Sequence, residues 1–229
     1  MHGAITHIIH YWGGHFGGHY VDWRARRIAV IVQHYGPGFF DGKTLVEVGA
    51  GHADIGAVFA RMGAKVTAVE GRQENVDAIE TLTPEVTALL ADLDGKWPSL
   101  EPFDIVLHLG LLYHLKHFEE SLRLACANGK HLILETEVSD SDDPFYVLHP
   151  TEASSHYDQA LGGVGSRPSP AYVERILTEC GMKFQRIEEP QLNTVYARRG
   201  IIDHYYAWPI QNTGKWASGW RKMWFAEKV

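Results

Sequence analysis

The chain has 229 residues, of which 45% are hydrophobic and 21% charged, and its formal net charge is −7 with histidine neutral. These values are typical of one globular domain and exclude extensive disorder. The basic residues are mostly scattered along an acidic chain. Nucleic-acid binding is therefore not expected, because phosphate recognition needs a concentrated positive field.

Localisation can be predicted from apolar runs and cysteines. No apolar run reaches the roughly 18 residues that cross a bilayer, and the N-terminus lacks the charged-then-apolar order of a signal peptide. Cys126 and Cys180 lie in predicted helices and are expected to be buried thiols, which suits a reducing compartment. We therefore expect a soluble, cytoplasmic protein without a membrane segment; its oligomeric state stays open.

Residues 1–40 are predicted to form a loop and a helix that cover a functional site. The apolar positions between residues 21 and 35 recur with helical spacing, and a Gly-Pro-Gly sequence then ends the helix. His15 and His19 have a spacing that can hold zinc on a helix, but two glycines lie between them and no third ligand is near. We expect no metal site.

From residue 44 onward, strand-like runs alternate with helical patterns. The predicted strands are 44–49, 65–70, 86–90, 103–108, 130–137, 182–188 and 222–227. The predicted helices are 53–62, 73–82, about 116–127 and 170–180. This order predicts an α/β fold with a doubly wound, mostly parallel seven-stranded sheet whose C-terminal strand is antiparallel. The domain is predicted to span 41–229, with insertions at 139–169 and 190–221.

A glycine-bearing turn follows the first predicted strand. Gly49 and Gly51 allow the backbone to turn sharply and approach a ligand. A dinucleotide site would need a third glycine where Asp54 stands; the next one is Gly56, so the close helix packing of a pyrophosphate site is expected to be missing. Glu47 is an acid at the end of a buried strand, where a ligand ammonium would offset its desolvation. These features favour a cofactor that carries an amino acid.

Acidic residues also end the next two strands. Glu70, 19 positions after Gly51, has two oxygens that can accept bonds from ribose hydroxyls, although it could also be a solvated acid. Asp92 could accept a bond from an adenine amino group while Leu93 packs on the face of the ring. Together with the glycine turn, these positions favour an adenosine site.

The segment from about 40 to 138 resembles the class I S-adenosylmethionine-dependent methyltransferases. The similar stretches are VEVGAGH, VTAVEG, ADLD and FDIVLHLGLLYHL, in that order. The resemblance implies a Rossmann-like fold, S-adenosylmethionine (SAM) as cofactor and S-adenosylhomocysteine (SAH) as product. It implies that the cofactor contacts Gly49, Gly51, Glu70 and Asp92 and that residues 108–113 line it. With Glu47, Gly71, Leu93, His108 and Leu109, these are the candidate cofactor-binding residues, although His108 could instead face the core.

The segment around Tyr113 also resembles, more weakly, the tRNA wobble-uridine carboxymethyltransferases. In that subgroup a tyrosine that Tyr113 matches holds the carboxylate of a carboxylated SAM. Leu115 stands where that subgroup has an arginine, and the chain is acidic. We therefore favour the ordinary methyl donor and a small-molecule acceptor, and the carboxylated donor stays an open alternative.

His114 and Tyr113 are the candidate catalytic residues. If the acceptor is a hydroxyl, a base with a pKa near neutrality helps, and His114 is the best placed, although it could instead hold a loop. Tyr113 could bond the substrate or the cofactor. We predict methyl transfer to a small molecule such as a sugar or another metabolite. The alternatives are a tRNA-modifying enzyme and a non-catalytic cofactor-binding protein.

Overall fold

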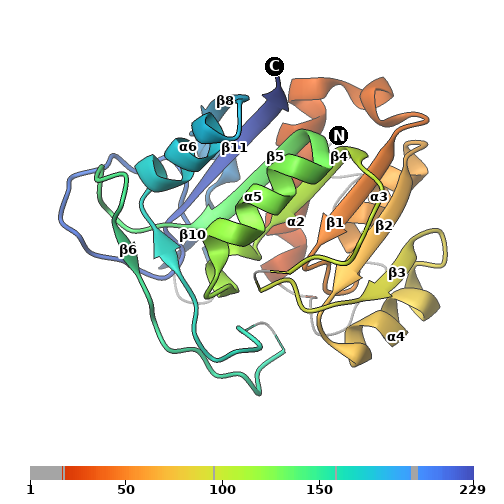
Figure 1. The fold of residues 1–229 in the computed structure, drawn as a ribbon, viewed down its shortest axis with the longest axis horizontal. Helices are drawn as coiled ribbons and strands as arrows, with labels where there is room; N and C mark the ends of the chain where they lie inside the picture. Colours follow the sequence, from red (N-terminus) through yellow and green to blue (C-terminus); the bar gives the residue numbers. More distant parts are fainter. Residues whose placement is uncertain (1–16, 18, 95, 158, 197–200) are drawn as a thin grey trace.

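The computed structural model describes residues 17, 19–94, 96–157, 159–196 and 201–229 and has one large sheet with helices on both faces (Figure 1). The strands are β1 (Thr44–Val48), β2 (Lys65–Glu70), β3 (Thr87–Leu90), β4 (Phe103–Leu109), β5 (Gly129–Glu137), β6 (Val147–Leu148), β7 (Arg167–Pro168), β8 (Met182–Ile187), β9 (Thr194–Tyr196), β10 (Ile201–His204) and β11 (Arg221–Lys228). The α-helices are α2 (His19–Tyr35), α3 (Asp54–Arg61), α4 (Gln73–Leu82), α5 (Phe118–Asn128) and α6 (Pro170–Glu179). Short 3-10 helices are η1 (Pro37–Phe40), η2 (Leu112–His114) and η3 (Pro190–Leu192).

The sheet has seven strands in the order β3-β2-β1-β4-β5-β11-β8. The first five strands run parallel to one another, whereas β11 is antiparallel to both β5 and β8. The predicted fold class, including the antiparallel C-terminal strand, is confirmed. The predicted elements match those observed to within a few residues.

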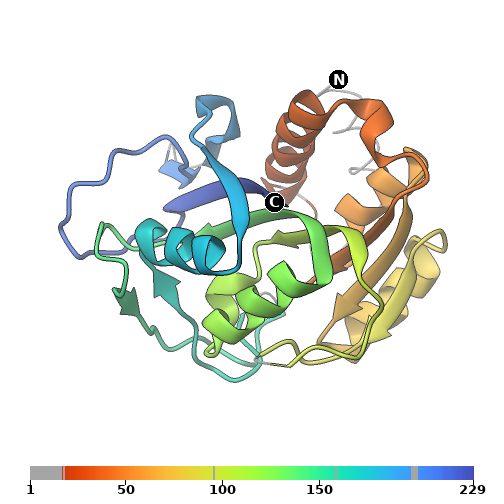
Figure 2. The same cartoon turned by 45° about the horizontal axis from the view of Figure 1, so that its top comes forward.

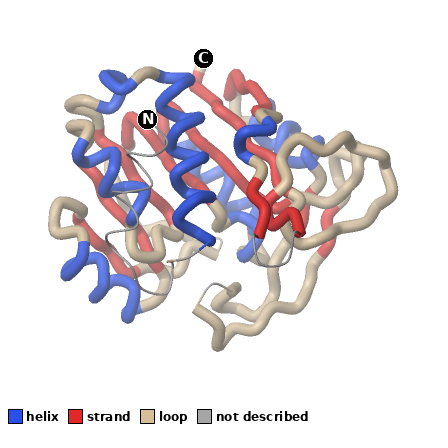
Figure 3. Tube along the Cα trace, turned by 180° about the vertical axis from the view of Figure 1, so that it is seen from behind, coloured by secondary structure: helices blue, strands red, loops and turns tan. Residues whose placement is uncertain are grey.

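The two faces of the sheet are covered by different helices. The N-terminal helices α2 and α3 pack on one face through a core that includes Ile28, Leu45 and Phe59. Helices α5 and α6 pack on the other face, in a core that includes Val46 and Trp224. Figure 2 shows α2 and α5 on opposite sides of the sheet, and Figure 3 shows α2 lying across the back of the strands. Both layers are needed because parallel strands are apolar on both faces.

The two predicted insertions contain strands that we did not predict. The segment 139–169 holds the pair β6 and β7, and the segment 190–221 holds η3 and the antiparallel pair β9 and β10. These strands are two to four residues long. Such lengths are too short for an alternating pattern to be recognised.

Cys126 is buried and Cys180 is partly buried, and both are free thiols. Among the helices that the structure describes, none has the length and apolar character needed to cross a membrane.

Candidate active site

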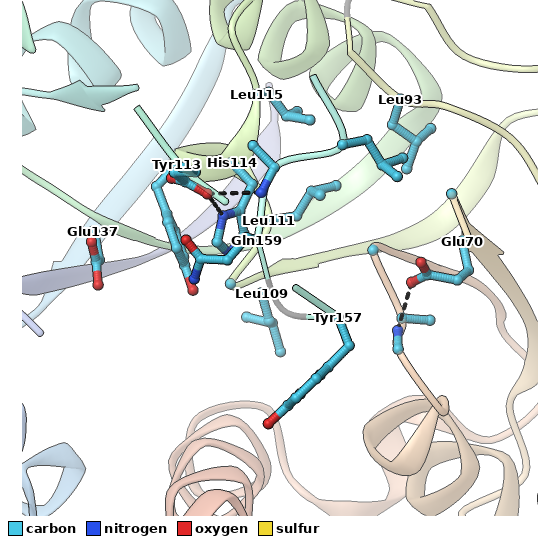
Figure 4. A pocket seen from close by; sticks show the side chains of 18 of the residues that line it. Glu70, Leu93, Leu109, Leu111, Tyr113, His114, Leu115, Glu137, Tyr157 and Gln159 are labelled. Atoms are coloured by element: carbon cyan, nitrogen blue, oxygen red, sulfur yellow. Dashed lines mark hydrogen bonds and ion pairs between the residues drawn. The ribbon is translucent and has the colours of Figure 1, made fainter. Parts of the chain in front are cut away.

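A cavity of about 420 Å³ opens at the carboxyl ends of the parallel strands. Residues from α2, the turn after β1, the ends of β2 and β4, and the segments 150–162 and 216–221 line it. This is where open parallel sheets bind their ligands, and the volume lies within the range of small-molecule sites. Figure 4 shows it with Glu70 at one end and Tyr113 and His114 at the other.

The turn after β1 forms one wall of the cavity. Gly49 has φ +66°, and a Cβ there would lie 2.8 Å from the Cβ of Leu111, so both backbone and space require glycine. Gly51 has φ +58°, and its amide donates to Oε2 of Glu70 at 2.8 Å. Helix α3 begins immediately afterwards. The turn therefore brings backbone to the wall of the cavity without intervening side chains; that it contacts a ligand there stays a prediction.

Gly56 allows the close helix packing that we expected to be missing. Its amide donates to Oε2 of Glu47 at 2.9 Å. A Cβ on Gly56 would lie 2.5 Å from that oxygen and 3.0 Å from Cγ1 of Val66. The prediction failed because the glycine that permits close packing lies two positions further along the chain than in the dinucleotide pattern.

Glu47 is an unusual acid because it is 4% exposed and still lines the cavity. Burial raises the pKa of Glu47 to about 8, against the opposing effects of the Gly56 hydrogen bond and the nearby Arg24. Arg24, from α2, forms an ion pair with Asp54 at the start of α3. This end of the cavity can therefore accept a cation beside Glu47, whereas the guanidinium of Arg24 is already paired with Asp54.

Glu47→Gln is expected to stabilise the ligand-free protein at alkaline pH. The unfolded chain ionises Glu47 near its ordinary pKa of about 4.3, whereas the folded protein keeps the proton up to about pH 8. The raised pKa of Glu47 means that the wild type loses stability as pH rises between these two values. Gln removes this titration and keeps an oxygen for the Gly56 amide.

Thermal unfolding from about pH 4 to about pH 9 checks the Glu47 prediction. The free energy of unfolding of Glu47→Gln should exceed that of the wild type only slightly at about pH 4, and the difference should grow to a few kcal/mol near pH 8. A difference between the two proteins that stays constant with pH would contradict the assigned titration of Glu47.

Glu70 lies at the opposite end of the glycine turn. It is 7% exposed; Oε2 accepts from the Gly51 amide and Oε1 accepts from the Arg72 amide at 3.1 Å. A carboxylate has about four lone-pair positions, so it can accept two further bonds from a diol. Leu93 is buried in the cavity wall, and Asp92 lines the cavity from an exposed position. These side chains suit a ribose and an adenine ring.

His108 does not line this cavity. It is fully buried in β4, and burial lowers the pKa of His108 to about 3. Its neighbour Leu109 does line the cavity, together with Gly71. Side chains of a strand alternate between faces, so Leu109 and His108 point to opposite sides of the sheet. We therefore remove His108 from the candidate cofactor residues.

His114 forms a pair with a buried carboxylate at the other end of the cavity. Its Nδ1 lies 2.5 Å from Oε2 of Glu152, whose side chain is 3% exposed. Burial raises the pKa of Glu152, but the His114 hydrogen bond, the amide of Ala160 and the charge of Arg167 outweigh it and hold that pKa below its usual range. When the proton is on Nδ1, Nε2 carries the lone pair that a base needs.

Beyond Glu152, buried charges alternate along one chain of contacts. In order, its members are His114, Glu152, Arg167, Glu137, Arg221, Glu135 and Arg27. The contacts between arginines and glutamates range from 2.7 to 3.2 Å. Three guanidinium groups face three carboxylates, so each buried charge has an opposite partner.

Tyr113 lies against this charged chain. Its hydroxyl accepts from Nη2 of Arg221 at 3.0 Å, and the guanidinium groups of Arg167 and Arg221 lie 4.8 and 4.6 Å from the centre of its ring. Burial raises the pKa of Tyr113, so the phenol is neutral. Tyr113 can therefore donate a hydrogen bond toward the cavity but is unsuited to act as a base.

Sequence patterns did not identify the charged residues that contact His114 and Tyr113. Glu135 and Glu137 stand in an apolar strand, a signal that could have marked them, because buried acids need partners. Glu152, Arg167 and Arg221 carry no comparable local signal. The aromatic segment 190–221 both walls the cavity, through Trp216, and packs elsewhere, since Trp208 stacks on Trp220 with ring centres 5.0 Å apart.

No metal site can be built from the part of the chain that the structure describes, where no group of three or more His, Cys, Asp and Glu side chains could hold an ion. His15 lies outside the described residues, as does the side chain of His19. The predicted absence of metal at that pair therefore stays a prediction.

No family model matches the chain. Over 117 residues it is 31% identical to the ubiquinone biosynthesis O-methyltransferase of Paramagnetospirillum magneticum, a match that covers 45% of this chain and 47% of that protein. The chain thus matches about half the length of this curated relative.

Solved structures cover much more of the chain. The N-terminal domain of EvdMO1 with SAH bound superposes with a TM-score of 0.67, at 18% identity, over 93% of this chain and 85% of that one. The chain has the class I methyltransferase fold. Magnesium protoporphyrin IX methyltransferase from Synechocystis PCC 6803 with SAM bound gives a TM-score of 0.57, at 13% identity, over 91% of this chain and 82% of that one. This methyltransferase fold agrees with the fold that the sequence predicts.

Proposed function

We propose that the protein transfers a methyl group from SAM to a hydroxyl of a small molecule. The observation that carries this proposal is that one cavity contains both the glycine turn with Glu70 and the His114–Glu152 pair. The first arrangement suits the cofactor, and the second suits deprotonation of an acceptor. The named activity of the O-methyltransferase relative agrees with this reaction.

The proposed cofactor orientation follows from charge and shape. Glu70 would accept the ribose hydroxyls, Leu93 and Asp92 would contact adenine, and Gly49 and Gly51 would lie against the amino-acid portion. Glu47 would face the ammonium group, whose charge would favour ionisation of this buried acid. When bound, SAM supplies an electrophilic methyl group on a sulfonium.

The proposed role of the residues near His114 is to prepare the acceptor. His114 would take the hydroxyl proton at Nε2, and Glu152 would orient the ring through Nδ1 and stabilise the imidazolium. Tyr113 would orient the acceptor by donating a hydrogen bond. The buried walls would exclude water, since methyl transfer depends chiefly on alignment of the reacting atoms.

Binding and turnover test the proposal in two steps. Titration calorimetry with SAH should give a dissociation constant in the micromolar range typical of such sites. Incubation with methyl-labelled SAM and a panel of sugars, phenols and other hydroxyl compounds should then release SAH. The N-terminal domain of EvdMO1 was also solved in the presence of SAH and D-fucose, so deoxysugars belong in that panel. Absence of SAH binding would refute the proposed function.

His114→Phe is expected to lower kcat/KM by about 100-fold, because it removes the base. The variant keeps the contact with Tyr113, whose ring centre lies 4.0 Å away. SAH binding should change by less than about threefold, since His114 lies at the far end of the cavity from Glu70. Initial rates with the accepted substrate and calorimetry with SAH measure both effects. Full activity in the variant would exclude His114 as the base.

Two alternatives make different predictions. A tRNA-modifying enzyme would bind tRNA with strong salt dependence, which a filter-binding assay detects. A non-catalytic protein would bind SAH but form none from SAM with any acceptor. A carboxylated donor would be revealed by the mass of copurified cofactor. The ordinary donor is favoured because the two guanidinium groups beside Tyr113, those of Arg167 and Arg221, are already paired with glutamates. We propose the cytoplasm as its location, on the basis of its two free thiols.

A further inference from the structure

Residues 150–157 and 159–162, called the cap below, form one wall of the cavity (drawn in green to teal at the bottom of Figure 1). Antiparallel contacts close the base of the cap: Thr151 pairs with Val164, and the Glu152 amide donates to the Gly163 carbonyl at 2.9 Å. Gln159 of the cap lies near His114 and Tyr113 in Figure 4. The cap therefore reaches the His114 end of the cavity.

One arginine, Arg72, binds the cap at the end of the cavity where Glu70 lies. Nη2 of Arg72 donates to the carbonyl oxygens of Ser154, His156 and Gln159 at 3.2, 2.8 and 3.0 Å. The backbone amide of the same residue donates to Oε1 of Glu70 at 3.1 Å. A single residue thus contacts both the candidate ribose-binding acid and three carbonyls of the cap.

Leu161 gives the cap a second contact, with Gly71, the residue that precedes Arg72. A Cβ on Gly71 would lie 2.5 Å from Cδ1 of Leu161, so the absence of a side chain at position 71 allows Leu161 to approach. Leu161 is 42% exposed. The cap is therefore held here mainly by the charged hydrogen bonds of Arg72 and only partly by apolar burial.

At its other edge the cap supplies the partner of the candidate base. Glu152 belongs to the cap, and its Oε2 accepts from the Ala160 amide at 2.8 Å while lying 2.5 Å from Nδ1 of His114. Ala160 directly follows Gln159, which Arg72 holds. A continuous set of contacts therefore runs from Glu70 through Arg72 and the cap to His114.

We propose that Arg72 is a positioning residue that couples the cofactor end of the cavity to the base. By gathering three carbonyls it keeps Ala160 and Glu152 in place, and Glu152 in turn orients His114. This inference rests on the proposed function for its catalytic consequence. Its structural consequence, an ordered cap that SAH at Glu70 protects further, follows from reciprocal coupling between two sites.

Hydrogen exchange of the cap amides tests this role without an acceptor. Arg72→Met should raise exchange of the peptides covering the cap at least tenfold, in the free protein and with SAH, whereas strands β1, β4 and β5 should keep their protection. Arg61→Met is the matched control, since this exposed arginine of α3 pairs with Glu85 and does not line the cavity. Unchanged exchange of the cap in Arg72→Met would overturn the proposal.

A second variant guards against loss of folding. If Arg72→Met lacks the thermal transition of the wild type, Arg72→Lys is used, because it keeps the charge but lacks the planar fork of donors. It should raise exchange of the cap by a smaller factor; wild-type exchange of the cap in Arg72→Lys would then overturn the proposal.

The kinetic readout separates positioning from simple cofactor binding. With an accepted substrate, the Arg72 variant should lose about tenfold in kcat while KM for SAM changes less than threefold. A loss confined to KM would overturn the coupling to the base. If wild-type protein fails to bind SAH, the proposed function fails, whereas the exchange measurement on the free protein still decides whether Arg72 orders the cap.

Discussion

Glu70→Ala is expected to abolish SAH binding, with a rise in dissociation constant of at least about 100-fold. Two charge-assisted hydrogen bonds to the ribose would be lost, each worth about 1.5–3 kcal/mol. The Gly51 and Arg72 amides that now donate to the carboxylate would also lose their partner. The thermal shift that saturating SAH produces in the wild type should therefore disappear in the variant.

Calorimetry below the unfolding temperature of the variant measures this effect, with circular dichroism to verify folding. Glu80→Ala is the control, because Glu80 is an exposed acid of α4 outside the cavity. It should bind SAH like the wild type. Binding to Glu70→Ala within threefold of the wild type would show that Glu70 does not hold the ribose.

Arg221→Met is expected to destabilise the fold by about 3–5 kcal/mol at neutral pH, because it removes one partner from buried ion pairs. Arg221 is 4% exposed and donates to Glu135, Glu137 and the Tyr113 hydroxyl at 3.0–3.2 Å. Met has a similar length but no charge, so the buried carboxylates of Glu135 and Glu137 would lose the positive charge that Arg221 supplies to both.

The Arg221 effect has a defined pH dependence. Burial raises the pKa of Glu137, but Arg221 and Arg167 outweigh it, so the folded pKa lies below the usual value. The stabilisation is therefore present above the unfolded pKa and is lost as pH falls through the folded pKa. The difference in the free energy of unfolding between the wild type and Arg221→Met should therefore become smaller as the pH falls.

Urea unfolding at about pH 7 and about pH 4 measures both predictions for Arg221. Arg26→Met is the matched control: its side chain is 33% exposed and pairs with Asp22 on the surface of α2, so it should cost less than about 1 kcal/mol. A loss below about 1 kcal/mol in Arg221→Met would show that the buried chain of charges does not depend on this arginine.

The sheet and the glycine turn beside Glu70 were predictable from local patterns. Strands and helices alternate in a regular order, and the spacing of nearby apolar residues predicts each of them. The glycine turn and Glu70 belong to consecutive strands, and parallel strands of one sheet bring their carboxyl ends to the same edge. Topology therefore places Gly51 beside Glu70 once the fold is known.

His108 and Gly56 show where local patterns failed. His108 stands next to residues that line the cavity, but strand alternation turns it to the opposite face. Gly56 departs from the known glycine spacing and still allows α3 to approach Glu47. For His108 the orientation of the side chain decided whether the residue lines the cavity. For Gly56 the absence of a side chain decided how closely the helix packs. Neither follows from the position of the residue in a motif.

The arrangement of side chains around His114 required the tertiary structure. His114 and Glu152 are 38 positions apart, and Tyr113 and Arg221 are 108 apart. The sequence alone determined which strands would form and that a glycine turn would follow the first of them, because those features depend on neighbouring residues. Only the folded chain decided which buried acid pairs with which arginine and which carboxylate orients the candidate base, because such pairs come from segments whose separation leaves no periodic signal.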